Sequence, residues 1–537
     1  MNRDDHNLKI ESEERTPIVE RLLSIIDVMQ MQLTQQSEKI DLLLAEIRKL
    51  KKLSPKPKIK PSTLPKDPDD KDPPSTGSSG SKKRAGSLKR SKNKTLKIDV
   101  EKIISAENVP DGAVSKGYQD YIVQDLIIET RVIKYRLERW KLPDGSEMIA
   151  KLPEEIRGHH FGTTLRAYII HQHYHQYVTQ PLLHAQLLEW GIDISTGQIN
   201  RILTEGKEKF HEEKTALLKA GLSIADYIQV DDTGARHKGK NGYCTFVGNA
   251  LFSWFSSTSC KSRINFLKLL RCEESDYELT EESFEYMKRY RVAPWIYDKL
   301  FASAEKTFPN EERWKQHLIS LGIVNKHYIR LVTETALIGS VLNHGFSKST
   351  VILSDDAGQF NIFLHALCWI HAERAVKALV ANSDMQQQAI DWARNEIWEI
   401  YHSLLIYKLA PNEQSKTAIT ERFDKFCTMK TGYQTLNLRL KKFRRDKAEL
   451  LLVLERPEIP IHNNQSESDI REYVKRRKIS GPTRSDDGRK CRDTFISLKK
   501  TATKLGVGFW GYLIDRINNT GTVPSLPQLL ILNASKG

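Results

Sequence analysis

The sequence predicts a multidomain protein of the α/β plus α class. Its 537 residues exceed one ordinary domain and suggest roughly three or four folded units. Two apolar strands that each end in paired aspartates, near residues 224–234 and 350–358, predict a mixed sheet. Segments with helical periodicity precede, interrupt and follow these strands, so helical regions are expected around the sheet.

The charge balance favours an anionic partner. The chain contains 83 Lys+Arg and 68 Asp+Glu, a net charge of +15, which makes nucleic acid the first candidate and an anionic membrane the second. No apolar run reaches the roughly 20 residues that span a bilayer, and the N-terminus is polar, so we expect a soluble, cytoplasmic protein. The six cysteines are scattered without a CxxC pair, which indicates neither a disulfide framework nor a zinc ribbon.

Residues 1–52 are predicted to form a coiled-coil helix. Apolar residues alternate at spacings of four and three from Leu22 onward, with Gln36 at the one polar position of the seam. We expect a homo-oligomer through this helix, and the alternative is packing against a later domain. Residues 53–97 shift to Pro, Ser, Gly and Lys, which predicts a disordered basic linker that is either solvated or neutralises phosphates.

Residues 98–160 are predicted to form a small β-rich module. Apolar and polar residues alternate in residues 118–123 and again in residues 131–137, which is typical of strands with one covered face. The sequence assigns no chemistry to this module.

Residues 161–220 are predicted to be a helical, helix-turn-helix-like DNA-binding region. A helix over residues 181–190, a glycine-bearing turn and a second helix capped by Ser195 make up the layout. Gln198 and Arg201 on the second helix would meet a DNA groove. The alternative is chance, because two helices and a turn are common.

Three histidines, His171, His173 and His175, precede this layout. His171 and His175 share a helical face, but no carboxylate or cysteine nearby completes a metal site, so a cluster without metal is expected.

Residues 221–515 are predicted to form the α/β core. One strand ends at Asp231-Asp232 and a second ends at Asp355-Asp356. Neighbouring strand ends are close enough for such carboxylates to share hard cations. Aspartates that merely mark turns would explain one such case more easily than two.

A third acid follows much later, where a loop delivers a helix. Glu467, Arg471 and Lys475 lie at i, i+4 and i+8 and therefore share one helical face. Asn464 followed three residues later by Glu467 is also the pattern of a capping box. With acids at two strand ends, Glu467 becomes a candidate third metal ligand, and whether it also caps the helix stays open.

Three motifs together resemble those of a known family. They are Val230-Asp231-Asp232-Thr233; Leu353-Ser354-Asp355-Asp356-Ala357 with Cys368-Trp369-Ile370-His371-Ala372-Glu373-Arg374 downstream; and Asn463-Asn464-Gln465-Ser466-Glu467. They resemble the three acidic blocks of the insertion sequence 66 family of DDE transposases. The stretch from Arg477 to about Tyr512 resembles that family's C-terminal block, so the resemblance covers most of residues 161–515.

The resemblance implies a DNA transposase with an RNase H-like mixed-sheet catalytic core, which cleaves DNA at insertion-element ends and joins the freed ends to a target. It implies Asp231, Asp355 and Glu467 as catalytic and metal-ligating acids. The choice of Asp231 over Asp232, and of Asp355 over Asp356, rests on the family pattern. Oxygen-only ligation by these acids suits two Mg²⁺ or Mn²⁺ ions.

The implied partner is double-stranded DNA of the element ends and the target, which would make the protein nucleoid-associated, with accessory proteins of the same element as further partners. Candidate contacts to the DNA backbone are Arg471, Lys475, Arg477 and Lys478, with further capacity in Arg484, Arg489, Lys490 and Arg492. A solvated basic face is the alternative for the last four.

The chain also departs from the family pattern. Residues 98–160 lack the cysteines of a zinc module, so no zinc is predicted. Residues 273–349 form a longer helical insertion than expected, either a DNA-binding addition or an inert elaboration, and residues 385–450 form a second helical insertion. Cys368 and His371 suit packing better than a metal pair. Residues 516–537 are left as a C-terminal tail.

Two other functions stay open on the sequence. One is an RNase H-like metal-dependent nuclease that hydrolyses DNA without joining strands. The other is a non-catalytic, DNA-binding descendant of a transposase.

Overall fold

The computed structural model describes residues 97–108 and 110–535. The chain divides into two units, residues 48–132 and the remainder. The predicted coiled coil of residues 1–52 lies outside the described residues, as does the predicted linker except for residue 97. The described part of the first unit, residues 97–108 and 110–132, contains no helix or strand.

The strands predicted within residues 98–160 were wrong. Residues 118–123 and 131–137 form no strand, and the β structure of this region is one short antiparallel hairpin of β1 (Arg139–Lys141) and β2 (Glu147–Ile149). An alternating pattern specifies a strand only where one face is buried. Here the apolar side chains are exposed, Val132 by 98%. A strand would therefore gain no stability from burying one face.

Residues 161–220 are helical, as predicted. The helices here are η1 (Glu154–Ile156), α2 (Thr163–Ile170), the π-helical η2 (His171–His175), α3 (Gln180–Glu189), α4 (Thr196–Thr204) and α5 (Glu208–Ile224). The side chain of Ser195 caps α4 by accepting a hydrogen bond from the amide of Gln198 at 3.1 Å. Leu183 of α3 and Ile199 of α4 are fully buried in the same core. Both helices and the cap therefore form as expected.

The centre of the molecule is a mixed five-stranded sheet, as predicted. Its strands are β3 (Tyr227–Gly234), β4 (Tyr243–Gly248), β5 (Ser253–Thr258), β8 (Val351–Ser354) and β9 (Leu364–Leu367), in the order β5-β4-β3-β8-β9. β3, β4 and β5 pair antiparallel, whereas β8 is parallel to both β3 and β9. The ends of β3 and β8 therefore meet at one edge of the sheet.

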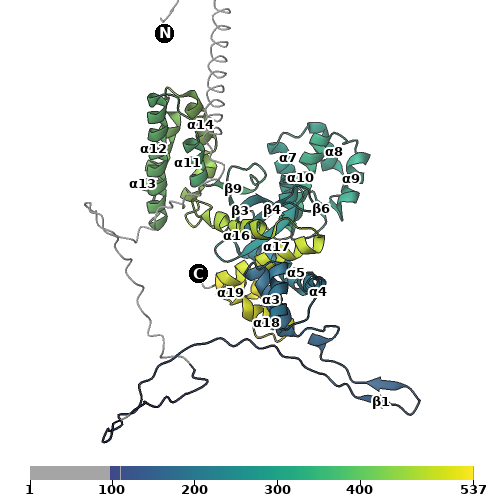
Figure 1. The fold of residues 1–537 in the computed structure, drawn as a ribbon. Coiled ribbons are helices and arrows are strands. Elements are labelled where there is room, and N and C mark those ends of the chain that lie inside the picture. Colours follow the sequence, from purple (N-terminus) through teal and green to yellow (C-terminus); the bar gives the residue numbers. More distant parts are fainter. Residues whose placement is uncertain (1–96, 109, 536–537) are drawn as a thin grey trace, which may run out of the picture. The chain divides into compact units, whose positions relative to one another are not determined.

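Two long helices, α16 (Asn464–Ser480) and α17 (Asp486–Lys504), pack against the sheet (Figure 1), α16 against β3 and β4. α17 follows the edge strand β5. The backbone amides of Ser253, Phe255 and Ser257 donate to the side chains of Thr501, Ser497 and Asp493, at 3.0, 2.9 and 2.7 Å. Four helical residues rise about 6 Å and two strand residues about 6.7 Å, so the two spacings match. The amides of the edge strand are therefore paired by helix side chains.

The segment between β5 and β8 is mostly helical, as predicted for residues 273–349. Its elements are α6 (Arg263–Leu270), β6 (Tyr277–Glu278), α7 (Glu281–Arg289), α8 (Pro294–Ala302), β7 (Thr307–Phe308), α9 (Glu311–Ser320) and α10 (Lys326–Asn343). β6 and β7 form a small antiparallel pair. Most of α10 is buried, and its side chains belong to the same core as those of β3 and α17.

The second predicted insertion is also helical. It follows α11 (Trp369–Lys377) and consists of α12 (Asp384–Leu409), α13 (Glu413–Thr428), α14 (Gln434–Arg445), α15 (Lys447–Leu450) and η3 (Leu452–Leu454). Figure 1 shows α11 to α14 gathered in one helical group. Their core is distinct from the first and includes Val351 and Leu353 of β8, so the insertion and the sheet share buried contacts.

The described part of residues 516–537, which was predicted as a C-terminal tail, contains helical structure. α18 (Phe509–Asn518) crosses the predicted boundary and α19 (Leu526–Ala534) follows it. Leu526 and Leu530 are fully buried in the first core. Within residues 97–108 and 110–535, no helix is both long and apolar enough to cross a membrane. All six cysteines are free thiols.

Candidate active site

The first two predicted acids lie at matching positions along neighbouring strands, Asp231 within β3 and Asp355 directly after the last residue of β8. β3 and β8 are parallel, and Gln229 is paired with Leu353 in their register. Asp231 and Asp355 each follow that pair by two residues, so their backbones lie about one strand spacing, roughly 4.8 Å, apart. Side chains two residues apart share a face of a sheet, so Asp231 points to the same side as Gln229.

This register brings negative charges together. Burial raises the pKa of the Asp231 carboxyl to about 7, the amide of Asp232 opposes the shift by donating to it at 2.7 Å, and the charges of Asp355, Asp232 and Glu467 add to it. The three predicted acids are thus close enough to interact. A cation bound here would relieve their mutual repulsion.

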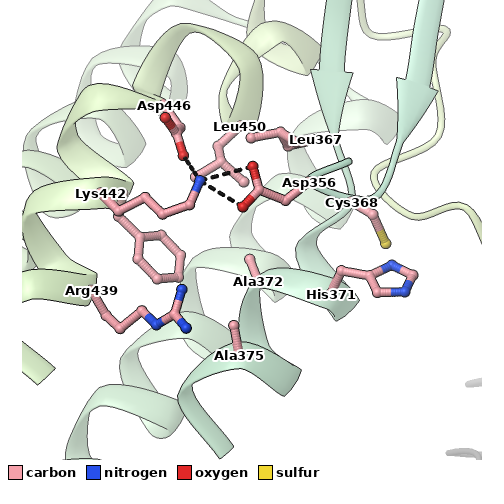
Figure 2. A pocket seen from close by; sticks show the side chains of 11 residues that line it. Asp356, Leu367, Cys368, His371, Ala372, Ala375, Arg439, Lys442, Asp446 and Leu450 are labelled. Atoms are coloured by element: carbon pink, nitrogen blue, oxygen red, sulfur yellow. Dashed lines mark hydrogen bonds and ion pairs between the residues drawn. The ribbon is translucent and has the colours of Figure 1, made fainter. Parts of the chain in front are cut away.

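The neighbouring aspartates are engaged elsewhere. Asp232 accepts hydrogen bonds from the Thr245 hydroxyl at 2.5 Å and from the Gln359 amide at 2.9 Å, so both of its oxygens are occupied. Asp356 forms an ion pair with Lys442 of α14 at 2.7 Å, in the pocket shown in Figure 2. Asp231 and Asp355 accept hydrogen bonds from backbone amides, of Asp232 at 2.7 Å and of Ala357 at 3.1 Å, and the choice of these two acids stays a prediction.

Glu467 reaches this region from the first turn of α16. The amide of Ser466 donates to the Gln229 side chain at 3.0 Å, which ties the start of α16 to the centre of β3. α16 begins at Asn464 with Asn463 as its N-cap residue, and no side chain caps it. Glu467 therefore does not also cap the helix, the possibility that the sequence left open, and its carboxylate faces other partners.

Those partners belong to α11. Arg374 Nη1 lies 2.6 Å from Glu467 Oε1, and His371 Nε2 lies 3.5 Å from the same oxygen. The Glu467 side chain is only 15% exposed. The hydrogen bond to Glu467 is the main cause that raises the pKa of Arg374 above its usual range. The sequence pattern gave Arg374 no role, since its partner lies 93 residues away in the chain.

Backbone contacts hold α11 and the approach to α16 together. The amide of Trp369 donates to the carbonyl of Ile461 at 3.1 Å, and the amide of Asn463 donates to Cys368 Sγ at 3.4 Å. Cys368 is buried. Both side-chain amide atoms of the fully buried Asn463 lack a hydrogen-bond partner among the described residues. Such an orphaned group suggests that a further ligand or water completes this region.

Comparison with known sequences identifies the family. A family profile described as "Transposase IS66 family" matches residues 334–491, which contain Asp355 and Glu467. An uncharacterized protein, y4jO, of Sinorhizobium fredii (strain NBRC 101917 / NGR234) is 41% identical over 322 residues, which are 60% of this chain and 100% of that protein. The chain belongs to the IS66 transposase family. The resemblance predicted from its three motifs is thereby confirmed.

In this IS66 transposase family member, three predicted DNA contacts are exposed on α16. Arg471, Lys475 and Lys478 face solvent, although Arg471 lies 3.5 Å from Glu467. Arg477 instead donates to the backbone carbonyl of Gly234 at the end of β3, which leaves it partly buried.

Two other cations of the basic stretches are structural. Arg476 is buried and donates to the backbone and ring of His173 in η2. Arg492 is 8% exposed and donates to the carbonyl of Gly481, so the phosphate-binding capacity predicted for it was wrong. His173 therefore has a partner in the fold, and His171 and His175 stack on each other with ring centroids 4.6 Å apart.

Gln198 and Arg201 lie on α4, which precedes the first strand of the sheet in the chain. Arg201 donates to the Gln198 side chain through Nε and Nη2, at 3.1 and 2.7 Å, so the two side chains form one polar unit on the helix surface. α4 is joined to α17 where Cys491 Sγ donates to the carbonyl of Thr204 at 3.6 Å.

The donor set suits hard divalent cations. Carboxylate oxygens are the ligands that Mg²⁺ and Mn²⁺ prefer, and the crowded charges around Asp231 favour a cation. Within the described part of the chain, however, no three His, Cys, Asp or Glu side chains are already gathered as a metal site. Glu467 is instead paired with Arg374.

Proposed function

We propose that the protein is a DDE-type transposase that cleaves and rejoins DNA strands at insertion-element ends. The observation that carries the proposal is the register of β3 and β8, which sets Asp231 and Asp355 side by side, with Glu467 near enough to raise the pKa of Asp231. In this proposal the mixed sheet is the RNase H-like core implied by the family, and Asp231, Asp355 and Glu467 are its catalytic acids.

Asp231, Asp355 and Glu467 would hold two Mg²⁺ or Mn²⁺ ions. Such ions, when bound, supply activation of a water or a 3′-hydroxyl and stabilisation of the leaving oxygen in an in-line displacement at phosphorus. The protein's own part is to orient the acids. Gln229 fixes the first turn of α16 against β3, and Arg374 orients the Glu467 carboxylate.

The substrate would be double-stranded DNA of the element ends and the target. Arg471, Lys475 and Lys478 on α16 would contact phosphates beside the acids, with Arg477 contributing less because it is bound to Gly234. Gln198 and Arg201 would contact a DNA groove from α4, the second helix of the helix-turn-helix-like layout. This DNA partner would make the protein nucleoid-associated.

The sequence further predicts a homo-oligomer through residues 1–52, and accessory proteins of the same element remain proposed partners.

The test is cleavage of DNA that flanks the coding sequence on both sides, in Mg²⁺ or Mn²⁺. Asp231→Ala, Asp355→Ala and Glu467→Ala are each expected to abolish nicking while binding in a gel-shift assay persists. Asp356→Asn is the matched control, since its carboxylate binds Lys442, and it should retain nicking. Retained nicking in any of the three alanine variants would refute the assignment of the acids.

Precut ends and a target plasmid separate the alternatives. A transposase yields a joined product, whereas a metal-dependent nuclease nicks the flanking DNA but joins nothing. A non-catalytic descendant binds the DNA without nicking it in either metal.

A further inference from the structure

The turn between β3 and β4 projects from the edge of the sheet that carries the acids. β3 continues past Asp231 to Gly234, which is paired with Tyr243 at the start of β4. Residues 235–242, called the hairpin tip below, connect the two strands. At about 3.3 Å per residue of extended chain, Gly234 at the base of the tip lies roughly 10 Å beyond Asp231, and Lys238 lies at most about 23 Å beyond it.

The hairpin tip is fixed to the connection between α16 and α17. The amide of Lys238 donates to the carbonyl of Thr483 at 2.9 Å, and the amide of Thr483 donates to the carbonyl of Arg236 at 3.2 Å. The His237 ring shares a hydrogen bond of 2.8 Å with the Thr483 hydroxyl and lies 2.9 Å from Asp486. A turn held at several points presents its side chains in fixed positions.

Cations gather on this fixed surface. Arg236, Lys238 and Lys240 of the tip are exposed, as is Arg484 of the connection. Lys238 pairs with Asp486, but the side chains of Lys240 and Arg484 have no hydrogen bond or ion pair within the described residues. These unpaired charges lie at the same edge of the sheet as the acids and favour an anionic partner.

The exposed face of α16 runs from the acids to the hairpin tip. α16 starts beside Gln229, and ten residues after Glu467 its Arg477 bonds to Gly234 at the base of the tip. At 1.5 Å per residue this spans about 15 Å. Arg471, Lys475 and Lys478 are exposed along the same helix. The cations therefore continue from the acids to the tip.

We propose that the hairpin tip and residues 481–485 bind the sugar-phosphate backbone of duplex DNA beside the cleaved phosphate. At 3.4 Å per base pair, the contacts would lie about 3–7 base pairs from the cut. Lysine and arginine on a fixed turn suit phosphates, which position the duplex without reading its sequence. The inference rests on the proposed function, because it takes the strand-end acids as the cleavage site.

The test compares two double variants with the same loss of charge. Lys240→Gln with Arg484→Gln removes the two unpaired cations. Lys315→Gln with Lys425→Gln removes two exposed lysines on α9 and α13. Binding to duplex DNA is measured in EDTA over a range of salt concentrations, so no cleavage is needed.

Each lost phosphate contact lowers the slope of log affinity against log salt by about 0.9, so the first variant should lose about 2 in slope. The control should keep the wild-type slope. An unchanged slope in the first variant, or an equal change in both, overturns the inference.

A photoreactive phenylalanine in place of Lys240 tests the position of the contact. Crosslinks are expected about 3–7 nucleotides from the cleaved phosphate, and crosslinks confined to more distant DNA overturn the inference. Wild-type protein that binds DNA but shows no metal-dependent cleavage would refute the proposed function alone, and the slope comparison would still decide whether the tip binds duplex DNA.

Discussion

Arg374 is the residue that most changes how Glu467 is understood. It donates to both carboxylate oxygens of Glu467, at 2.6 and 3.4 Å, and its own side chain is 47% exposed. A half-exposed ion pair contributes about 1 kcal/mol or less. If Glu467 is a metal ligand, as proposed, a bound metal would displace this contact, and Arg374 would compete with the metal for the carboxylate.

Arg374→Gln is therefore expected to tighten the apparent affinity for Mn²⁺ about three- to fivefold, as measured by calorimetry. Arg394→Gln is the matched control, because Arg394 forms its ion pair with Glu373, 2.7 Å away, and does not contact Glu467. Equal or weaker Mn²⁺ affinity in Arg374→Gln would contradict the competition.

Asp515 should make the C-terminal helices sensitive to acid. Burial raises its pKa, but hydrogen bonds from the Thr520 hydroxyl and from the backbone at Val523 and Thr522 outweigh burial and hold the pKa below its usual range. A depressed carboxyl pKa stabilises the fold above the unfolded value, near 3.9, and that contribution is lost as pH falls through the folded value.

Asp515→Asn is expected to destabilise α18 and α19 by about 1–3 kcal/mol at pH 7. The difference from wild type should shrink as pH falls below about 4, where the Asp515 carboxyl of the unfolded chain becomes protonated while that of the folded protein is still ionised. Hydrogen exchange of residues 509–534 at several pH values measures both effects. Asp144→Asn, on an exposed turn, should change exchange in this region at no pH.

Among the elements, α17 shows how helix side chains can accept hydrogen bonds from the backbone amides of an edge strand. Ser497→Ala removes the acceptor of the Phe255 amide, which leaves a buried donor unpaired. An unsatisfied buried donor costs about 1–3 kcal/mol. A lower urea midpoint with an unchanged slope is the expected result.

Ser535→Ala is the control for Ser497→Ala, since its exposed hydroxyl bonds only within α19. Equal midpoints for the two variants would mean that the ladder along β5 contributes no stability.

The elements also show what sequence can predict. β3 and β8 have buried apolar residues before their aspartates, so pattern and burial agree, although β3 continues past its aspartates to Gly234 and β8 ends at Ser354. β9 was missed because four residues that lead directly into a helix carry no separate signal. Residues 118–123 alternate like a strand but lack a covering surface. The local pattern therefore predicts an element correctly where burial of its apolar face in the core stabilises that element.

The sequence predicted the acids of the candidate site but not the side chains that bind them. The acids stand out because they end strands or open a helix. The contact of Arg374 with Glu467, and the occupation of Asp232 by Thr245 and Gln359, depend on residues brought together by the fold. No spacing along the chain encodes those partners. The capping-box interpretation failed because it considered only neighbours in sequence.

At the scale of the whole molecule, the second helical insertion is coupled to the sheet. Phe423 of α13 is fully buried, and its ring centroid lies 6.0 Å from that of Trp369, which opens α11. Val351 and Leu353 of β8 belong to the same core. We therefore expect the insertion and this half of the sheet to unfold together.

Phe423→Ala is expected to cost about 3–5 kcal/mol in urea unfolding. Leu409→Ala is the control, because Leu409 is 87% exposed and should change stability by less than about 0.5 kcal/mol. A small effect of Phe423→Ala, or loss of the insertion's helices while the sheet stays folded, would show that the insertion folds independently.

The ladder between α17 and β5 also has a consequence for the order in which the chain is made. The residues of β5 are synthesised about 240 positions before those that cover them. At 5–20 residues per second, the amides of this strand wait on the order of 10–50 s for their partners. An uncovered edge strand is a template for pairing with another chain. A nascent chain that stops before residue 493 would therefore present an open edge that the finished protein does not have.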